Sequence, residues 1–226
     1  MALMSVFACK EVKKEDTNAS KTEQVEKFTP ETFNEADVPE NIKKQEKTKI
    51  VGGAKWKDKQ GDFLLVLAEI PVFQKLSQDS PKYNVNHTEA QAYLFKNGKQ
   101  IQKYLIVESA PLDVKANFIK EATTVIDSDK NEIGEAIILI KHHTRGDVSA
   151  SDLTLVAFTD ESKYEMKGTM KVILPKDSPM AKDMPDGMGG EKNTKGFINA
   201  PASLLQQAEA IWEKYYKEDF EKHFQQ

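Results

Sequence analysis

The sequence has little of several residues, and each shortage excludes a class of protein. Only one cysteine occurs among 226 residues, so the chain can form neither an intramolecular disulfide framework nor a cysteine-rich zinc site. No run approaches the roughly 20 apolar residues that a membrane-spanning helix needs. The formal net charge of −4 argues against nucleic acid as the main partner, because nucleic-acid-binding proteins usually carry a strongly basic face.

Arginine is almost absent, and the single one stands out. The chain has 32 lysines and arginines, of which Arg145 is the only arginine, and lysine cannot reproduce its planar, bidentate guanidinium. Arg145, Gly146 and Asp147 match the integrin-binding tripeptide, but Gly-Asp before a strand is also an ordinary turn. We predict a structural turn, in which Arg145 points inward and pairs with Asp147, Asp152 or a carboxylate of a nearby loop.

The amino terminus resembles the end of a bacterial lipoprotein signal. An apolar run ends at Cys9, with Val6 three residues before it and Ala8 directly before it. The resemblance implies cleavage before Cys9 and lipidation of its sulfur, which would anchor the chain stably to a membrane. The run departs from such signals because it is short and has no basic start. The alternative is a cytosolic protein whose terminus carries a free cysteine.

Residues 10–49 are rich in charge and poor in apolar side chains. This segment has nine lysines and ten acidic residues, and so few apolar groups cannot offset the entropy of ordering. We therefore predict three parts: a signal remnant over 1–9, a flexible charged linker over 10–49, and one β-rich globular domain with a carboxy-terminal helix over 50–226. The charged stretch after Cys9 also resembles signals that send lipoproteins to the outer membrane or cell surface.

The period of the globular part is mostly two, which indicates strands. Asn97-Gly98 joins two such segments, 89–96 and 99–108, and predicts a type I′ hairpin. Further strands are expected at 62–70 (ended by Pro71), 122–126, 135–141, 153–159 and 163–174. Residues 176–194 are expected to form a long loop. Apolar residues spaced by three and four over 203–224 predict a helix. The fold class is therefore α+β: a mostly antiparallel sheet or sandwich covered by one helix.

One loop has the residues of a calcium site. Oxygen-bearing side chains fall at positions 1, 3, 5 and 9 of the segment that begins at Asp127, and a backbone carbonyl near position 7 would add another ligand. A strand follows, which excludes an EF-hand, and the loop resembles the strand-flanked loops of integrin-type propeller repeats. The predicted ligands are Asp127, Asp129, Asn131, Ile133 and Glu135.

Position 6 of this loop departs from the calcium pattern. It holds Glu132, where a glycine normally permits the sharp turn, and the glycine comes later, at Gly134. The loop either turns elsewhere and binds calcium weakly, or it survives as a polar hairpin whose Asp and Asn side chains cap their own backbone. Both alternatives stay open from the sequence.

Three segments carry a broader resemblance: Trp56–Asp62, the aspartate loop, and His143–Asp152. In this order, with strands between them, they resemble a family of uncharacterised bacterial surface proteins associated with surface polysaccharide biosynthesis, over roughly residues 50–220. The resemblance implies a cell-envelope lipoprotein whose partners are the membrane, surface polysaccharide or other envelope proteins. It brings no established catalytic residues.

No catalytic motif can be assigned. His142 and His143 are neighbours on a predicted strand and should face opposite ways, so they cannot easily share one metal ion. Glu69, Glu108, Glu135 and Asp147 are the acids to examine for sugar hydrolysis, although their separations depend on the fold. The favoured hypothesis is a non-enzymatic, calcium-stabilised surface module. The alternative is a glycan-active hydrolase or transferase with the 176–194 loop as a lid.

Overall fold

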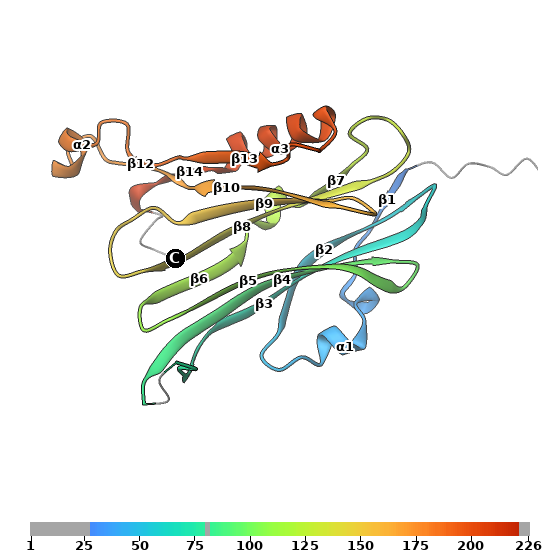
Figure 1. Cartoon of the computed structure of the whole chain (residues 1–226), viewed down its shortest axis with the longest axis horizontal. Coiled ribbons are helices and arrows are strands. Elements are labelled where there is room, and N and C mark those ends of the chain that lie inside the picture. The colour runs from blue at the N-terminus through green and yellow to red at the C-terminus, as the bar shows by residue number, and fades with distance from the viewer. Residues whose placement is uncertain (1–27, 80–81, 222–226) are drawn as a thin grey trace, which may run out of the picture.

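The computed structural model describes residues 28–79 and 82–221, and it consists mainly of antiparallel strands arranged in two large sheets (Figure 1). One helix, α3 (Ala202–Tyr215), lies near the carboxyl end. The predicted α+β class, a sheet-rich sandwich with a carboxy-terminal helix, is confirmed.

The first sheet is a meander in which each strand pairs with the next along the chain. Its strands are β1 (Thr29–Glu31), β2 (Lys49–Asp58), β3 (Gly61–Leu76), β4 (Asn84–Lys96) and β5 (Lys99–Ala110). The predicted hairpin joins β4 and β5. Asn97 and Gly98 both have positive φ, 49° and 76°, as a type I′ turn requires.

The second sheet has the order β13-β10-β9-β8-β6, and β7 also pairs with β8. Its strands are β6 (Asp113–Phe118), β7 (Thr124–Ile126), β8 (Glu135–Arg145), β9 (Asp152–Phe158), β10 (Lys163–Thr169) and β13 (Lys192–Gly196), and a 3-10 turn, η2 (Lys120–Ala122), precedes β7. Alternate residues of β8 face opposite layers: Ile138 and Ile140 pack against the first sheet, while Ile137 and Leu139 pack against α3. Both faces of β8 are therefore buried.

Helix α3 covers the outer face of the second sheet with Leu204, Ala208 and Trp212, all fully buried. The helix begins after Pro201, one residue before the predicted start at residue 203, but it ends at Tyr215 instead of continuing to residue 224. The next residues form β14 (Lys217–Asp219), which pairs in parallel with β11 (Lys171–Ile173). A buried ion pair between Lys141 Nζ of β8 and Glu218 Oε2 of β14, 2.5 Å apart, ties this segment to the sheet.

The segment before β2 is ordered where the structure describes it, which corrects the predicted flexible linker over 10–49. From residue 28 onward it forms β1, a 3-10 turn η1 (Glu35–Asp37) and a short helix α1 (Glu40–Lys43). Val38 and Ile42 are almost completely buried against the outer face of the first sheet. Two well-placed apolar side chains anchor a segment whose average composition is highly polar. Residues 10–27 lie outside the described residues.

Several other boundaries also differ from the prediction. Pro71 does not end its strand, because the β3–β4 pairing shifts register between Ile70 and Phe73 and so accommodates a residue that cannot donate a ladder hydrogen bond. The strand predicted over 163–174 divides at Met170 into β10 and β11, which belong to different sheets. The expected 176–194 loop contains α2 (Pro179–Asp183), β12 (Met188–Gly189) and the start of β13.

Different elements lie at the two ends of the molecule's long axis. The chain enters at β1, beside the loop between β7 and β8, whereas α2 and β12 lie at the opposite end (Figure 1). Within residues 28–79 and 82–221, no helix has the length and apolar character needed to cross a bilayer.

Candidate functional site

The aspartate loop lies between β7 and β8, and a buried carboxylate from the β2–β3 hairpin holds it in place. Asp58 is fully buried, and its Oδ2 accepts hydrogen bonds from the indole Nε1 of Trp56 (3.2 Å) and from the amide of Gly134 (3.0 Å). Lys59 adds a hydrogen bond from its Nζ to the carbonyl of Asn131 (2.5 Å). Two of the three segments that carry the family resemblance therefore meet in space.

Within the loop, the side chains at positions 1, 3 and 5 fold over the backbone that follows them. The two carboxylate oxygens of Asp127 accept the amides of Asn131 and Glu132, each at 2.9 Å. Asp129 also accepts the Asn131 amide (3.2 Å), and the Asn131 side chain accepts the Ile133 amide (2.8 Å). These contacts organise the loop as a tight polar turn.

Glu132 and Gly134 have separate roles that the sequence left open. Glu132 adopts φ of 65°, so the chain makes its left-handed turn at position 6 even though the residue there is not glycine. Gly134 has a packing role instead: a Cβ atom at this position would lie 2.6 Å from Trp56 Nε1 and 2.8 Å from the ring of Phe28. Gly134 thus lets the loop contact the first described residue of the chain.

The predicted calcium ligands lie in one loop, but their side-chain oxygens already accept hydrogen bonds from backbone amides of the same loop. Glu135, the closing acid, is buried and accepts the amide of Ser128 at 2.9 Å. Burial raises the pKa of Glu135, the hydrogen bonds from Ser128 oppose this, and the nearby carboxylates of Asp129 and Asp127 raise it further. No three His, Cys, Asp or Glu side chains of the described ranges are placed to hold a metal ion together. The present side-chain contacts fit a polar turn, and calcium binding stays a prediction.

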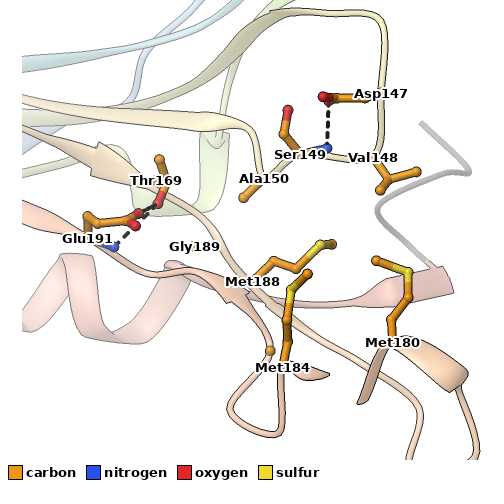
Figure 2. A pocket seen from close by; sticks show the side chains of 11 residues that line it. Asp147, Val148, Ser149, Ala150, Thr169, Met180, Met184, Met188, Gly189 and Glu191 are labelled. Carbon is orange, nitrogen blue, oxygen red and sulfur yellow. Dashed lines mark hydrogen bonds between the residues drawn. The ribbon is translucent and has the colours of Figure 1, made fainter. Parts of the chain in front are cut away.

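A groove of about 520 Å³ lies at the other end of the molecule, between the 145–151 turn and the segment that contains α2 and β12 (Figure 2). Asp147, Val148, Ser149 and Ala150 line one side of it. Three methionines, Thr169 and Glu191 line the other. The structure thus brings together two segments that are far apart in the sequence, the Arg-Gly-Asp turn and the long methionine-containing segment.

The two acids of this groove are held in their charged form. The hydroxyl and the amide of Ser149 lower the pKa of Asp147, whose Oδ1 accepts that amide at 2.9 Å. A hydrogen bond from the Thr169 hydroxyl lowers the pKa of Glu191. A general acid works best with a pKa near the working pH, and both shifts move these carboxylates away from it.

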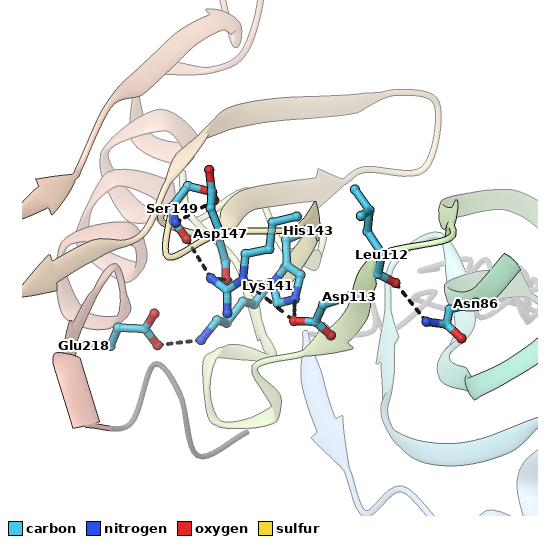
Figure 3. A network of polar contacts seen from close by, with 10 residues as sticks. Asn86, Leu112, Asp113, Lys141, His143, Asp147, Ser149 and Glu218 are labelled. Atoms are coloured by element: carbon cyan, nitrogen blue, oxygen red, sulfur yellow. Dashed lines mark hydrogen bonds and ion pairs between the residues drawn. The ribbon is translucent and has the colours of Figure 1, made fainter.

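The Arg-Gly-Asp turn is built around the largely buried side chain of Arg145. Figure 3 shows Asp147 and Ser149 of the turn close to Asp113 and His143. Arg145 Nη1 donates to the carbonyl of Ser149 (2.6 Å), and its Nε lies 3.8 Å from Asp113 Oδ2. Only 9% of the Arg145 side chain is exposed. The inward orientation agrees with a structural turn. Asp113 of β6 is a partner that was not predicted, while the charge of Arg145 also lowers the pKa of Asp147, one of the predicted partners.

Beneath the turn, three side chains have the composition of a hydrolase triad. His143 Nδ1 lies 2.9 Å from the hydroxyl of Ser151, and its Nε2 lies 3.0 Å from Asp113 Oδ2. Ser151 is 0% exposed, so a substrate cannot reach its oxygen without rearrangement of the turn. These contacts hold the His143 imidazole in one orientation and connect the turn to β6. It could not be found from the sequence because Asp113 joins the other two only through the β6–β8 pairing.

The remaining acids named from the sequence lie apart. Glu69 accepts the amide of Phe118 (2.8 Å), and Glu108 contacts His142 Nδ1 (2.8 Å). His142 and His143 face opposite sides of β8, as predicted, with His142 bound to Glu108 and Thr154 and His143 bound to Asp113 and Ser151. In the described residues, no two of these four acids have a hydrogen-bond partner in common. Cys9, the predicted lipidation site, lies outside the described residues.

Comparison with protein-family models, with curated proteins and with solved structures found no match to this chain.

The buried imidazole predicts a pH dependence of stability. Burial, with the nearby Arg145 charge adding to it, lowers the pKa of His143 from 6.5 to about 4. Between these values the unfolded chain binds more protons than the folded one, so the free energy of unfolding should fall as pH falls from 6.5 to 4. We expect a loss of about 1–2 kcal/mol attributable to His143 between pH 7 and pH 4.5, allowing for solvent screening.

Urea unfolding at a series of pH values checks this expectation. His143→Gln removes the titrating group and keeps a side chain that can donate a hydrogen bond to Asp113. The variant should be less stable at pH 7, but its stability should fall less steeply between pH 6.5 and 4.5. Equal slopes for both proteins would show that His143 does not take up a proton on unfolding.

Proposed function

We propose that this protein is a lipid-anchored component of the bacterial cell envelope, at the outer membrane or cell surface, and that it acts as a non-enzymatic binding module in a surface polysaccharide context. The observation that carries the proposal is the position of the groove. It lies at the end of the molecule opposite the entry of the chain (Figure 1). A domain tethered through Cys9 would therefore hold this groove away from the membrane.

The groove suits binding better than catalysis. Its two carboxylates, Asp147 and Glu191, are both held charged, and no aromatic ring is among its described lining residues. A glycan-cleaving site needs an acid that can donate a proton, and it commonly distorts a bound sugar ring as well. The neighbouring Ser151 is sealed beneath the turn. These features favour the binding module over the hydrolase or transferase alternative.

In this proposal the aspartate loop would stabilise the junction between the tether and the domain, and it would not contact the ligand. It lies at the end where the chain enters, and Gly134 packs against Phe28 and Trp56. Calcium bound by Asp127, Asp129, Asn131, Glu135 and the Ile133 carbonyl would stiffen this junction. Its affinity would fall in the weak class of extracellular calcium modules, on the order of 10⁻⁴ to 10⁻³ M.

Lipidation is the property that tests the proposed location. In the native host, Cys9→Ser should move the protein from the membrane fraction to the soluble fraction, because the acyl chains supply the membrane affinity. A matched control is Ser5→Ala, which leaves the cysteine intact and should remain in the membrane fraction. If Cys9→Ser stays with the membrane as the wild type does, lipid anchoring through Cys9 is wrong.

Calcium binding is tested by titration calorimetry on the full chain. The wild type should bind one ion in the range above, and Asp127→Asn combined with Asp129→Asn should lower the affinity at least tenfold. Each asparagine keeps one of the two accepting oxygens and replaces the other with an amide nitrogen. The double variant is therefore first shown to unfold as cooperatively as the wild type, so that a loss of binding is not a loss of folding. Asp62→Asn, on the neighbouring β3, is the control. Heat absent from the wild type, or unchanged in the double variant, would show that the loop does not bind calcium.

A further inference from the structure

The methionines of this protein are unevenly distributed. Of the five that the structure describes, Met166 and Met170 are buried in the core between the second sheet and α3. The other three, Met180, Met184 and Met188, all line the groove of Figure 2. Met188 and Met180 also pack in a small apolar cluster with Val172 and Leu174, but packing does not account for Met184, which is 41% exposed. An exposed methionine beside two others on one surface needs another explanation.

The backbone around these residues is shaped to bring the three side chains to one place. Met180 lies in α2, and Met184 follows its last turn, with its amide bonded to the Met180 carbonyl (2.9 Å). The chain then reverses at Gly187, whose φ is +83° and where a Cβ atom would lie 2.2 Å from the Val172 carbonyl. The reversal returns Met188 to β12, paired with Val172.

The side chains gather on one wall of the groove. In Figure 2 the side chains of Met184 and Met188 project into the same part of the groove, and the end of Met180 is turned toward them. Met184 is the residue that follows α2, one turn beyond Met180, and the turn at Gly187 adds the third methionine. The groove thus presents three neutral thioether sulfurs on its wall.

Thioether sulfur is a soft, uncharged ligand. Hard cations such as calcium and magnesium prefer oxygen, and zinc prefers thiolate and imidazole, whereas thioethers select copper(I) and its chemical relatives. No histidine or cysteine is among the described residues that line the groove. The charged carboxylates of Asp147 and Glu191 lie in the same groove and would favour a cation there.

We propose that Met180, Met184 and Met188 form a binding site for a soft monovalent d¹⁰ metal ion of the copper(I) class. The site binds the ion through three sulfurs and involves no change in oxidation state. It does not depend on the proposed envelope function, because its geometry and ligands come from the groove alone.

Silver(I) is the direct probe, because it has the same charge and ligand preference as copper(I) and is stable in air. The full chain carrying Cys9→Ser is titrated with silver nitrate in chloride-free buffer, since a free thiol would otherwise bind the ion first. We expect one equivalent to bind by calorimetry. With ¹³C-labelled methionine methyl groups, the NMR signals of Met180, Met184 and Met188 should shift, while those of Met166 and Met170 should not.

Two variants in the same Cys9→Ser background test whether binding needs the sulfur atoms or only side chains of this volume. Met184→Leu with Met188→Leu conserves volume and apolar character, and it should weaken silver binding at least tenfold. Met166→Leu makes the same chemical change in the core and should bind like the parent. Copper(I), added without oxygen against a chromogenic chelator, should repeat this order.

The proposal fails if silver binds the double variant as tightly as the parent, or if silver shifts none of the three groove methyl signals. The NMR measurement is made on the unsubstituted groove, so it decides the question even if the double variant folds poorly. Calcium added in place of silver should leave all the methionine signals unchanged, and an equal shift with calcium would also overturn the proposal.

Discussion

The structure depends on one constraint: strands β8 and β9 must be covered on both faces. Ile138, Ile140 and Val156 face the first sheet, and Ile137, Leu139 and Leu155 face α3, all with essentially no exposure. Burial of each such side chain contributes about 1.5–3 kcal/mol, so neither covering layer can be removed without exposing a large apolar surface. The second sheet is therefore the middle layer of the molecule, and the other elements are placed relative to it.

A strand of this middle layer, β8, also connects the two ends of the molecule. β8 begins at Glu135, which closes the aspartate loop, and it ends at Arg145, which builds the turn beside the groove. Strand β8 thus runs from the aspartate loop, at the end where β1 lies, to the turn beside the groove. The buried Asp58 carboxylate fixes the first end, and the Arg145, Asp113 and His143 contacts fix the second.

Much of the fold could be predicted from local patterns. The apolar run of β8, the Asn97-Gly98 turn and the spacing of Leu204, Ala208 and Trp212 each encode their structure within a few residues. Other features could not be predicted because they depend on a few side chains in an unfavourable context. Val38 and Ile42 order a segment whose average is strongly polar. Pro71 is tolerated only because the pairing shifts register there, and Met170 divides its strand because the two halves pair with different partners.

The candidate site was less predictable, because its contacts span long stretches of sequence. The polar turn of the aspartate loop, one of the two alternatives that the spacing of its residues suggested, is formed by local side-chain contacts. Its anchor, Asp58, lies 76 residues before Gly134, and a fully buried aspartate gives no local signal. Likewise, Asp113 reaches His143 only through the β6–β8 pairing, and the methionines meet the Asp147 turn only in the folded chain. The relevant segments could be identified from the sequence, but their association required the structure.

The most direct measurement of the layered arrangement is native-state hydrogen exchange, resolved by residue. If β8 and β9 form the doubly covered middle layer, their amides should exchange only through global unfolding and should be the slowest in the protein. The amides of α2 and of the exposed edge strand β13 should exchange faster, through local opening. Exchange of β8 and β9 as fast as that of α2 and β13 would contradict the layered arrangement, because the second sheet would then not be the buried centre of the molecule.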